Sequence, residues 1–147
     1  MNINGLEFAE DRLYDREHVW FKKEGDNLRM GITDFFQKMA NELVFIELPA
    51  VGRELEPGKP FVSVESGKWV GRVKSTIAGT VVNANGELAD FPYLLNDSPY
   101  DEGWIIDIKP ADMDYAADMF DLNDPKQLKD YEVFLEAERV RIESLSN

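Results

Sequence analysis

The residue best suited to covalent chemistry is Lys68, which stands between a glycine and a tryptophan in the stretch VESGKWVGRV. If Gly67 and Lys68 form a two-residue hairpin loop, the residues on either side pair by mirror symmetry about it. Glycine at the first loop position suits a type II′ turn, in which that residue has a positive φ angle. The amine of Lys68 would then project from the tip. A swinging-arm carrier needs such an amine, because an attaching enzyme must reach it, but the spacing also fits an ordinary solvated lysine.

The two faces of this predicted hairpin differ in polarity. The mostly apolar face would carry Val62, Val64, Ser66, Trp69, Gly71 and Val73. The mostly polar face would carry Phe61, Ser63, Glu65, Val70, Arg72 and Lys74. This difference predicts that the hairpin lies with its first face on a hydrophobic core.

No other group of residues forms a recognisable catalytic or metal site. The chain has no cysteine, which excludes disulfides, cysteine metal ligands and a cysteine nucleophile. His18 is the only histidine; the sequence names no acid–base partner for it, and a structural role beside Trp20 is expected. The stretch DLNDPK lacks the ligand spacing of an EF-hand. We therefore predict a protein that is not itself an enzyme and holds no metal.

Composition and charge limit which classes of partner and which location we expect for this protein. The 147 residues include 29 acidic and 16 basic ones, and the formal net charge is −13. So large an acidic excess argues against nucleic acid or an anionic membrane as a partner. The N-terminus lacks the pattern of a signal peptide, and no apolar run approaches the ~20 residues that span a bilayer. A cytoplasmic location is expected.

The pattern of the chain predicts a mainly β fold with a helical C-terminus. Short runs rich in Val, Ile and Phe, separated by Gly, Pro, Asp and Asn, predict strands from 19 to 82 and again at 103–109. Between them, Thr33 is expected to cap a short helix, DFFQKMA. Residues 112–120 predict a short helix, and Asp124-Pro125 predicts the start of a long one at roughly 125–144. One side of that helix would be lined by Leu128, Tyr131, Leu135, Ile142 and Leu145. We expect a single domain over 1–147, with a β-rich core at 1–110 and a helical appendix at 111–147.

Several ungapped motifs resemble the H protein of the glycine cleavage system. YDREHVWFKKEGD is similar to the opening Y-x-x-x-H-E-W segment of that family. GITDFFQKMANELVFIELPAVG follows its G-I-T-D-x-A-Q…L-G-D-x-V-F-V-E-L-P-x-V-G stretch, and LLNDSPYDEGW its L-x-N-x-x-P-Y-x-x-G-W. The family's V-E-S-x-K matches Val64 to Lys68. The resemblance covers about Tyr14 to Lys109.

This resemblance implies a lipoyl/biotinyl-type flattened barrel, or hammerhead sandwich. It implies lipoate attached covalently to Lys68, presented by the turn at Gly67, as an arm that carries an intermediate between enzymes. The implied partners are a lipoate ligase or another lipoate-attaching enzyme, glycine decarboxylase and dihydrolipoamide dehydrogenase. Biotin carriers are a related class, but their lysine usually lies between methionines, whereas Gly67 and Trp69 flank it here.

Several residues differ from the family pattern, and these differences bear on which chemical group the lipoyl arm carries. Val19 replaces the glutamate of H-E-W, Trp69-Val70 replaces two small residues, and Arg72 replaces an aspartate. Phe35 stands at a position often held by His or Tyr. A guanidinium repels a methylammonium cargo by roughly 1 kcal/mol or more, depending on exposure, and favours an anionic one.

On that ground the chain resembles the H-like lipoate-binding proteins of heterodisulfide-reductase-like sulfur oxidation. Arg72, with Lys74 as a second cation, would then contact a sulfur adduct on the arm, and a heterodisulfide-reductase-like complex would be a partner. Two alternatives stay open. The chain is an H protein that carries aminomethyl groups in glycine cleavage, or an unmodified H-like adaptor that binds a partner protein through its acidic C-terminal part.

Overall fold

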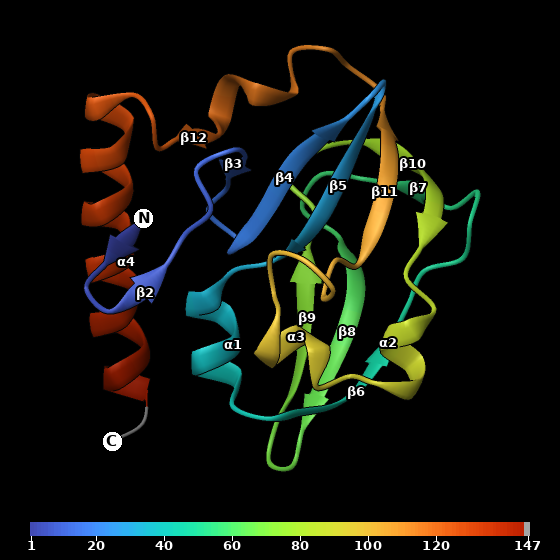
Figure 1. Ribbon diagram of the computed structural model, residues 1–147, viewed down its shortest axis with the longest axis horizontal. Coiled ribbons are helices and arrows are strands. Elements are labelled where there is room, and N and C mark those ends of the chain that lie inside the picture. The colour runs from blue at the N-terminus through green and yellow to red at the C-terminus, as the bar shows by residue number, and fades with distance from the viewer. Residues whose placement is uncertain (146–147) are drawn as a thin grey trace.

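Three antiparallel sheets form the body of the protein, shown in Figure 1. The computed structural model describes residues 1–145. The strands are β1 (Asn2–Ile3), β2 (Leu6–Glu7), β3 (Leu13–Tyr14), β4 (Val19–Glu24), β5 (Asn27–Ile32), β6 (Leu43–Glu47), β7 (Glu54–Leu55), β8 (Pro60–Ser66), β9 (Val70–Lys74), β10 (Gly79–Ala84), β11 (Ile106–Pro110) and β12 (Phe120–Asp121). The helices are α1 (Asp34–Ala40), α2 (Glu87–Asp90), α3 (Leu94–Asp97), the 3₁₀-helix η1 (Tyr115–Asp118) and α4 (Pro125–Leu145).

The hydrophobic core joins the two larger sheets. One sheet has the strand order β12-β3-β4-β5-β11-β10-β7, and the other has the order β6-β8-β9; β1 pairs only with β2. Alternate residues of these strands face inward, as the period of two in the sequence requires. The first sheet contributes Val19, Phe21, Met30, Ile106 and Ile108 to the core, and the second contributes Leu43, Ile46, Val62, Val64 and Val73. The short strand β9 is therefore fixed to the core along one face.

A second apolar cluster attaches α4 to this body. Tyr131 and Leu135 of α4 are buried against Tyr14, Trp20, Phe35 and Phe120. Figure 1 shows α4 at one side of the molecule, with α1 and the first strands nearest to it. Asp124 begins the helix by accepting the Lys126 N–H at 3.2 Å. Within residues 1–145, no helix is both long enough and apolar enough to cross a membrane.

The helix α1 bridges the two clusters because consecutive residues point to different sides of it. Phe35 belongs to the cluster under α4, whereas Phe36 belongs to the core between the sheets. Thr33 precedes the helix with extended backbone, and its Oγ1 accepts the Phe36 N–H at 3.2 Å. The predicted cap is thus confirmed, and it fixes where the helix begins.

Several predictions about elements needed correction. The long helix is present, but Leu145 is exposed and not part of its buried side. The segment predicted as a helix at 112–120 contains only the short η1, followed by β12, which pairs with β3. The strands β1, β2 and β3 and the helices α2 and α3 were not predicted, because each is only two to four residues long and shows no periodicity.

Candidate functional site

The hairpin of β8 and β9 presents Lys68 at its tip. The Ser66 N–H donates to the Trp69 carbonyl at 2.8 Å, which closes a two-residue loop of Gly67 and Lys68. The Lys68 N–H faces the Ser66 hydroxyl at 3.4 Å. Both loop residues are exposed, and within residues 1–145 the Lys68 Nζ has no hydrogen bond or ion pair. In Figure 1 the loop between β8 and β9 extends beyond the rest of the body.

The register of the hairpin agrees with the mirror symmetry predicted from the sequence. Val64 pairs with Gly71 and Glu65 pairs with Val70. The predicted polarity of the faces fails at one position, since Phe61 is buried where the ladder shifts register between Pro60 and Val62. The predicted type II′ turn is wrong, because the φ of Gly67 lies outside the left-handed region. A Cβ at Gly67 would meet nothing within 4 Å, so neither backbone conformation nor space requires glycine there.

On the inner face, Trp69 lies across Gly71. A Cβ on Gly71 would overlap Cη2, Cζ2 and Cζ3 of the Trp69 ring. The same ring lies 6.0 Å from the ring of Phe36 in α1, at an interplanar angle of 58°. Trp69 is nevertheless 40% exposed. The residue after Lys68 is thus an aromatic platform that is open to solvent on part of its surface.

The outer face places Arg72 away from Trp69. Arg72 pairs with Ser63, which in turn pairs with Glu47 of β6. These side chains line a shallow hollow of about 310 Å³ together with Arg53, which donates to the Pro60 carbonyl at 2.8 Å. Within residues 1–145 the guanidinium of Arg72 has no ion pair, and its side chain is exposed. The structure therefore brings Gly67 and Lys68 together at the tip and sets Arg72 behind them on the strand.

His18 lies under α4 and not near Lys68. Its ring stacks on Phe35 at 4.6 Å and on Phe134 of α4 at 5.4 Å, and Nε2 lies 2.8 Å from Glu138 Oε1. Burial lowers the pKa of His18, although Glu138 acts in the opposite direction. Its Nδ1 is buried and has no hydrogen-bond partner among residues 1–145. The structural role expected for His18 fits this geometry, but its partner Glu138 could not be found from sequence, because 120 positions separate the two residues.

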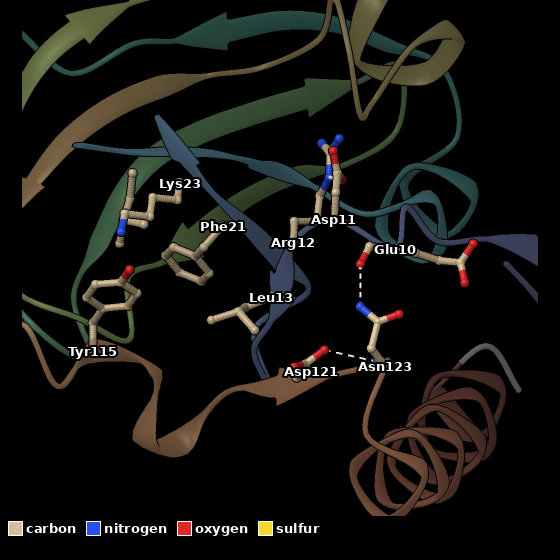
Figure 2. A pocket seen from close by; sticks show the side chains of 10 residues that line it. Glu10, Asp11, Arg12, Leu13, Phe21, Lys23, Tyr115, Asp121 and Asn123 are labelled. Carbon is tan, nitrogen blue, oxygen red and sulfur yellow. Dashed lines mark hydrogen bonds and ion pairs between the residues drawn. The ribbon is translucent and has the colours of Figure 1, made fainter. Parts of the chain in front are cut away.

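The hollow drawn in Figure 2 does not resemble a catalytic site either. It measures about 390 Å³, and its apolar wall is formed by Leu13, Phe21 and Tyr115. The one arginine that lines it, Arg12, donates to the Tyr100 carbonyl at 2.7 Å and stacks over Trp20 at 4.5 Å. The side-chain amide of Asn123 donates to the Glu10 carbonyl at 2.7 Å, as Figure 2 shows. Across residues 1–145, no three or more His, Cys, Asp or Glu side chains gather in a way that could hold a metal.

A sandwich of β-sheets that presents an exposed lysine on a hairpin is the architecture of carriers for a covalently attached cofactor. The family model described as "Glycine cleavage H-protein" matches residues 12–132. The chain belongs to this family.

Relatives and a solved structure agree with that assignment. The glycine cleavage system H protein of Halalkalibacterium halodurans is 43% identical over 115 residues, which is 78% of this chain and 90% of the relative. That of Geobacillus kaustophilus is 48% identical over 100 residues, which is 68% of this chain and 79% of the relative. The crystal structure of the H protein from Mycobacterium marinum superposes with a TM-score of 0.67 at 31% identity and covers 71% of this chain and 87% of that one.

Four predictions are confirmed by these findings: the family, the flattened lipoyl-type sandwich, the non-catalytic carrier role and lipoate as the covalent cofactor. The residues present fit that cofactor, since Lys68 offers an exposed amine with no partner in the described part of the chain and open space around Gly67. When attached, lipoate supplies a dithiolane whose sulfur atoms hold the transferred group. The relatives named here are glycine cleavage proteins, and none supports the sulfur-oxidation branch.

Proposed function

We propose that Lys68 bears the lipoyl group and that this protein carries the aminomethyl group of glycine between the enzymes of glycine cleavage. A lipoate ligase or a similar enzyme would attach the arm. Glycine decarboxylase would load it, and dihydrolipoamide dehydrogenase would reoxidise it. The observation that carries this proposal is the exposed amine of Lys68, which has no ion pair in the described part of the chain, at the tip of the β8–β9 hairpin of an H-protein family member.

Two other lysines near turns or helices, Lys59 and Lys38, are less suited to carry an arm. Lys59 also lies in a turn, but its Nζ forms an ion pair with Glu56 at 2.7 Å. Lys38 is bound to the Gly5 carbonyl and lies 3.7 Å from Asp34. Lys68 combines a two-residue loop, which restricts the backbone, with an amine that is free to react.

The charges nearest to the tip support a cationic cargo. Along the hairpin, Glu65 in its pair with Val70 is the first charged residue behind the loop. Arg72 lies two residue pairs further, which corresponds to about 7 Å at the usual rise of a strand. A carboxylate stabilises a nearby ammonium group, and the net charge of −13 favours cations over the whole surface.

A second candidate function is transport of a sulfur intermediate for a heterodisulfide-reductase-like complex. It is favoured by one observation, namely that Arg72 is exposed and has no ion pair within residues 1–145. Arginine binds oxyanions through two parallel hydrogen bonds. Loading by glycine and glycine decarboxylase distinguishes the two candidates, because only the first requires it.

The attachment site is tested by incubating the protein with lipoate, ATP and lipoate ligase, followed by intact-mass and peptide mass spectrometry. We expect one lipoyl group on Lys68 in the wild type and none in Lys68→Arg, which keeps the charge but removes the primary amine. Lys59→Arg is the matched control and should be modified like the wild type. An unmodified wild type, as an adaptor without a cofactor would give, would refute the carrier proposal.

A further inference from the structure

Three large apolar side chains are exposed beside the hairpin tip. Val44 is 53% exposed, Phe45 is 48% exposed and Val70 is 64% exposed. We call these three residues the outer-face patch. Exposed apolar side chains that cluster on a surface commonly mark an interaction site.

The register of the sheet brings the patch together from two edge strands. In the order β6-β8-β9, Glu65 of β8 pairs with Phe45 on one side and with Val70 on the other. Phe45 and Val70 therefore flank Glu65 on the face opposite Trp69. Side chains directly opposite each other on a sheet lie about 5 Å apart, so Phe45, Glu65 and Val70 form one row across it.

A β-bulge exposes Val44, the third residue of the outer-face patch. The pairing of β6 with β8 shifts register between Leu43 and Phe45, so Val44 is the additional residue. Leu43 and Ile46 remain buried in the core, while both residues between them face solvent. Bulges commonly redirect side chains at functional surfaces. The local sequence LVFIE is apolar enough for a fully buried strand, so its two exposed members are not explained by folding alone.

The position of the patch limits which partner can use it. Val70 is two residues from Lys68 in sequence, and its strand begins where the loop ends. An enzyme that acts on the dithiolane works at the far end of a long arm and has no need to touch the hairpin. An enzyme that attaches lipoate must bring its active site to the Nζ of Lys68 and must therefore cover the strands next to it.

We propose that the outer-face patch is the docking surface for the lipoate-attaching enzyme, an inference that rests on the function proposed above. In the attachment step, the uncharged Nζ attacks the carboxyl carbon of lipoyl-adenylate, which that enzyme forms from lipoate and ATP. An amide N–C bond forms, the C–O bond to AMP breaks, and the amine loses a proton; no electrons are transferred. The matching enzyme surface is apolar with a cation opposite Glu65, which has no ion pair within residues 1–145.

The test compares Phe45→Ser and Val70→Ser with Val133→Ser. Val133 is also 64% exposed but lies on α4, at a different side of the molecule (Figure 1). The initial rate of lipoylation is measured with lipoate ligase, lipoate and ATP at low carrier concentration. We expect the kcat/KM of attachment to fall about tenfold in each patch variant, as for a residue at an interface centre, and to stay unchanged in Val133→Ser.

A second readout separates docking from damage to the carrier. Fully lipoylated samples of each variant are reduced by dihydrolipoamide dehydrogenase with NADH, and their thermal unfolding is recorded. We expect wild-type values for both. Equal attachment rates in patch variants and wild type, or equal losses in attachment and reduction, would overturn the docking proposal alone. A wild type that accepts no lipoate would overturn the proposed function as well.

Discussion

Two glycines that contact tryptophan rings allow a sharp test of the packing described above. A Cβ at Gly31 would lie 2.5 to 2.7 Å from three ring atoms of Trp20. A Cβ at Gly71 would overlap the ring of Trp69 in the same manner. Neither glycine has a positive φ, so Gly31→Ala and Gly71→Ala change only the space beside the ring.

The two substitutions should lower the free energy of unfolding by different amounts, because the ring of Trp69 can move and the ring of Trp20 cannot. Trp20 is fully buried, donates from Nε1 to the Pro99 carbonyl at 2.9 Å and stacks under Arg12. Overpacking costs about 1–3 kcal/mol and the loss of one hydrogen bond adds about 1 kcal/mol, so we expect Gly31→Ala to destabilise by about 2–4 kcal/mol.

Trp69 is 40% exposed and can turn toward solvent. The loss of its contact with Phe36 costs about 0.5–1.5 kcal/mol, and replacing a strand glycine by alanine recovers about 0.5 kcal/mol. Gly71→Ala should therefore destabilise by about 1 kcal/mol or less.

Urea unfolding followed by circular dichroism measures both free energies. Tryptophan fluorescence provides the second readout, since Gly71→Ala should shift the emission of Trp69 to longer wavelength while Trp20 stays buried. The reasoning fails if Gly71→Ala costs as much as Gly31→Ala, or if Gly71→Ala leaves the emission spectrum unchanged.

Three further predictions concern the pH dependence, the cargo and α1. Burial raises the pKa of Asp15 to about 6, so the contribution of Asp15 to the free energy of unfolding falls as the pH rises from about 4 to 6. Burial lowers the pKa of His18, so the contribution of His18 to the free energy of unfolding falls as the pH drops below about 6.5. His18→Asn, which tolerates the positive φ of 64°, should remove the part of the pH dependence that His18 causes and keep the part that Asp15 causes in urea titrations at pH 4 to 7, and an unchanged profile would contradict this. Arg72→Asp should change the kcat/KM of aminomethyl loading by less than about threefold, because an exposed charge is screened by salt, and a gain above about tenfold would favour the sulfur candidate. Thr33→Ala should destabilise by about 1–2 kcal/mol in urea unfolding through loss of the cap on Phe36, whereas Thr33→Ser should be close to wild type.

The hairpin that presents Lys68 was predictable because its geometry is local. Once a two-residue loop is assumed, mirror symmetry fixes which residues pair, and the structure has Val64 opposite Gly71 as expected. The type of turn was not predictable from glycine alone, since glycine adopts negative as well as positive φ. The bulge at Val44 was also missed, because the apolar run from Leu43 to Ile46 carries no polar residue that would mark the shift in register.

Contacts between distant segments account for most of what the sequence did not predict. His18 and Glu138 approach only after α4 packs on the body, and nothing in the local pattern of either segment indicates the other. The exposure of Leu145 has a related cause, since the long helix extends past the surface that buries Tyr131 and Leu135. Amphipathic spacing predicts which face of a helix is apolar, but not how much of its length finds a partner.

The adjacent residues Phe35 and Phe36 also constrain how this sequence can change over evolution. Phe35 supports His18 and α4, while Phe36 supports Trp69 beside the loop of Lys68. A substitution in α4 that repacks Phe35 must rotate or shift the seven-residue helix and so move Phe36. We therefore expect the C-terminal helix and the residue after Lys68 to covary among close homologues.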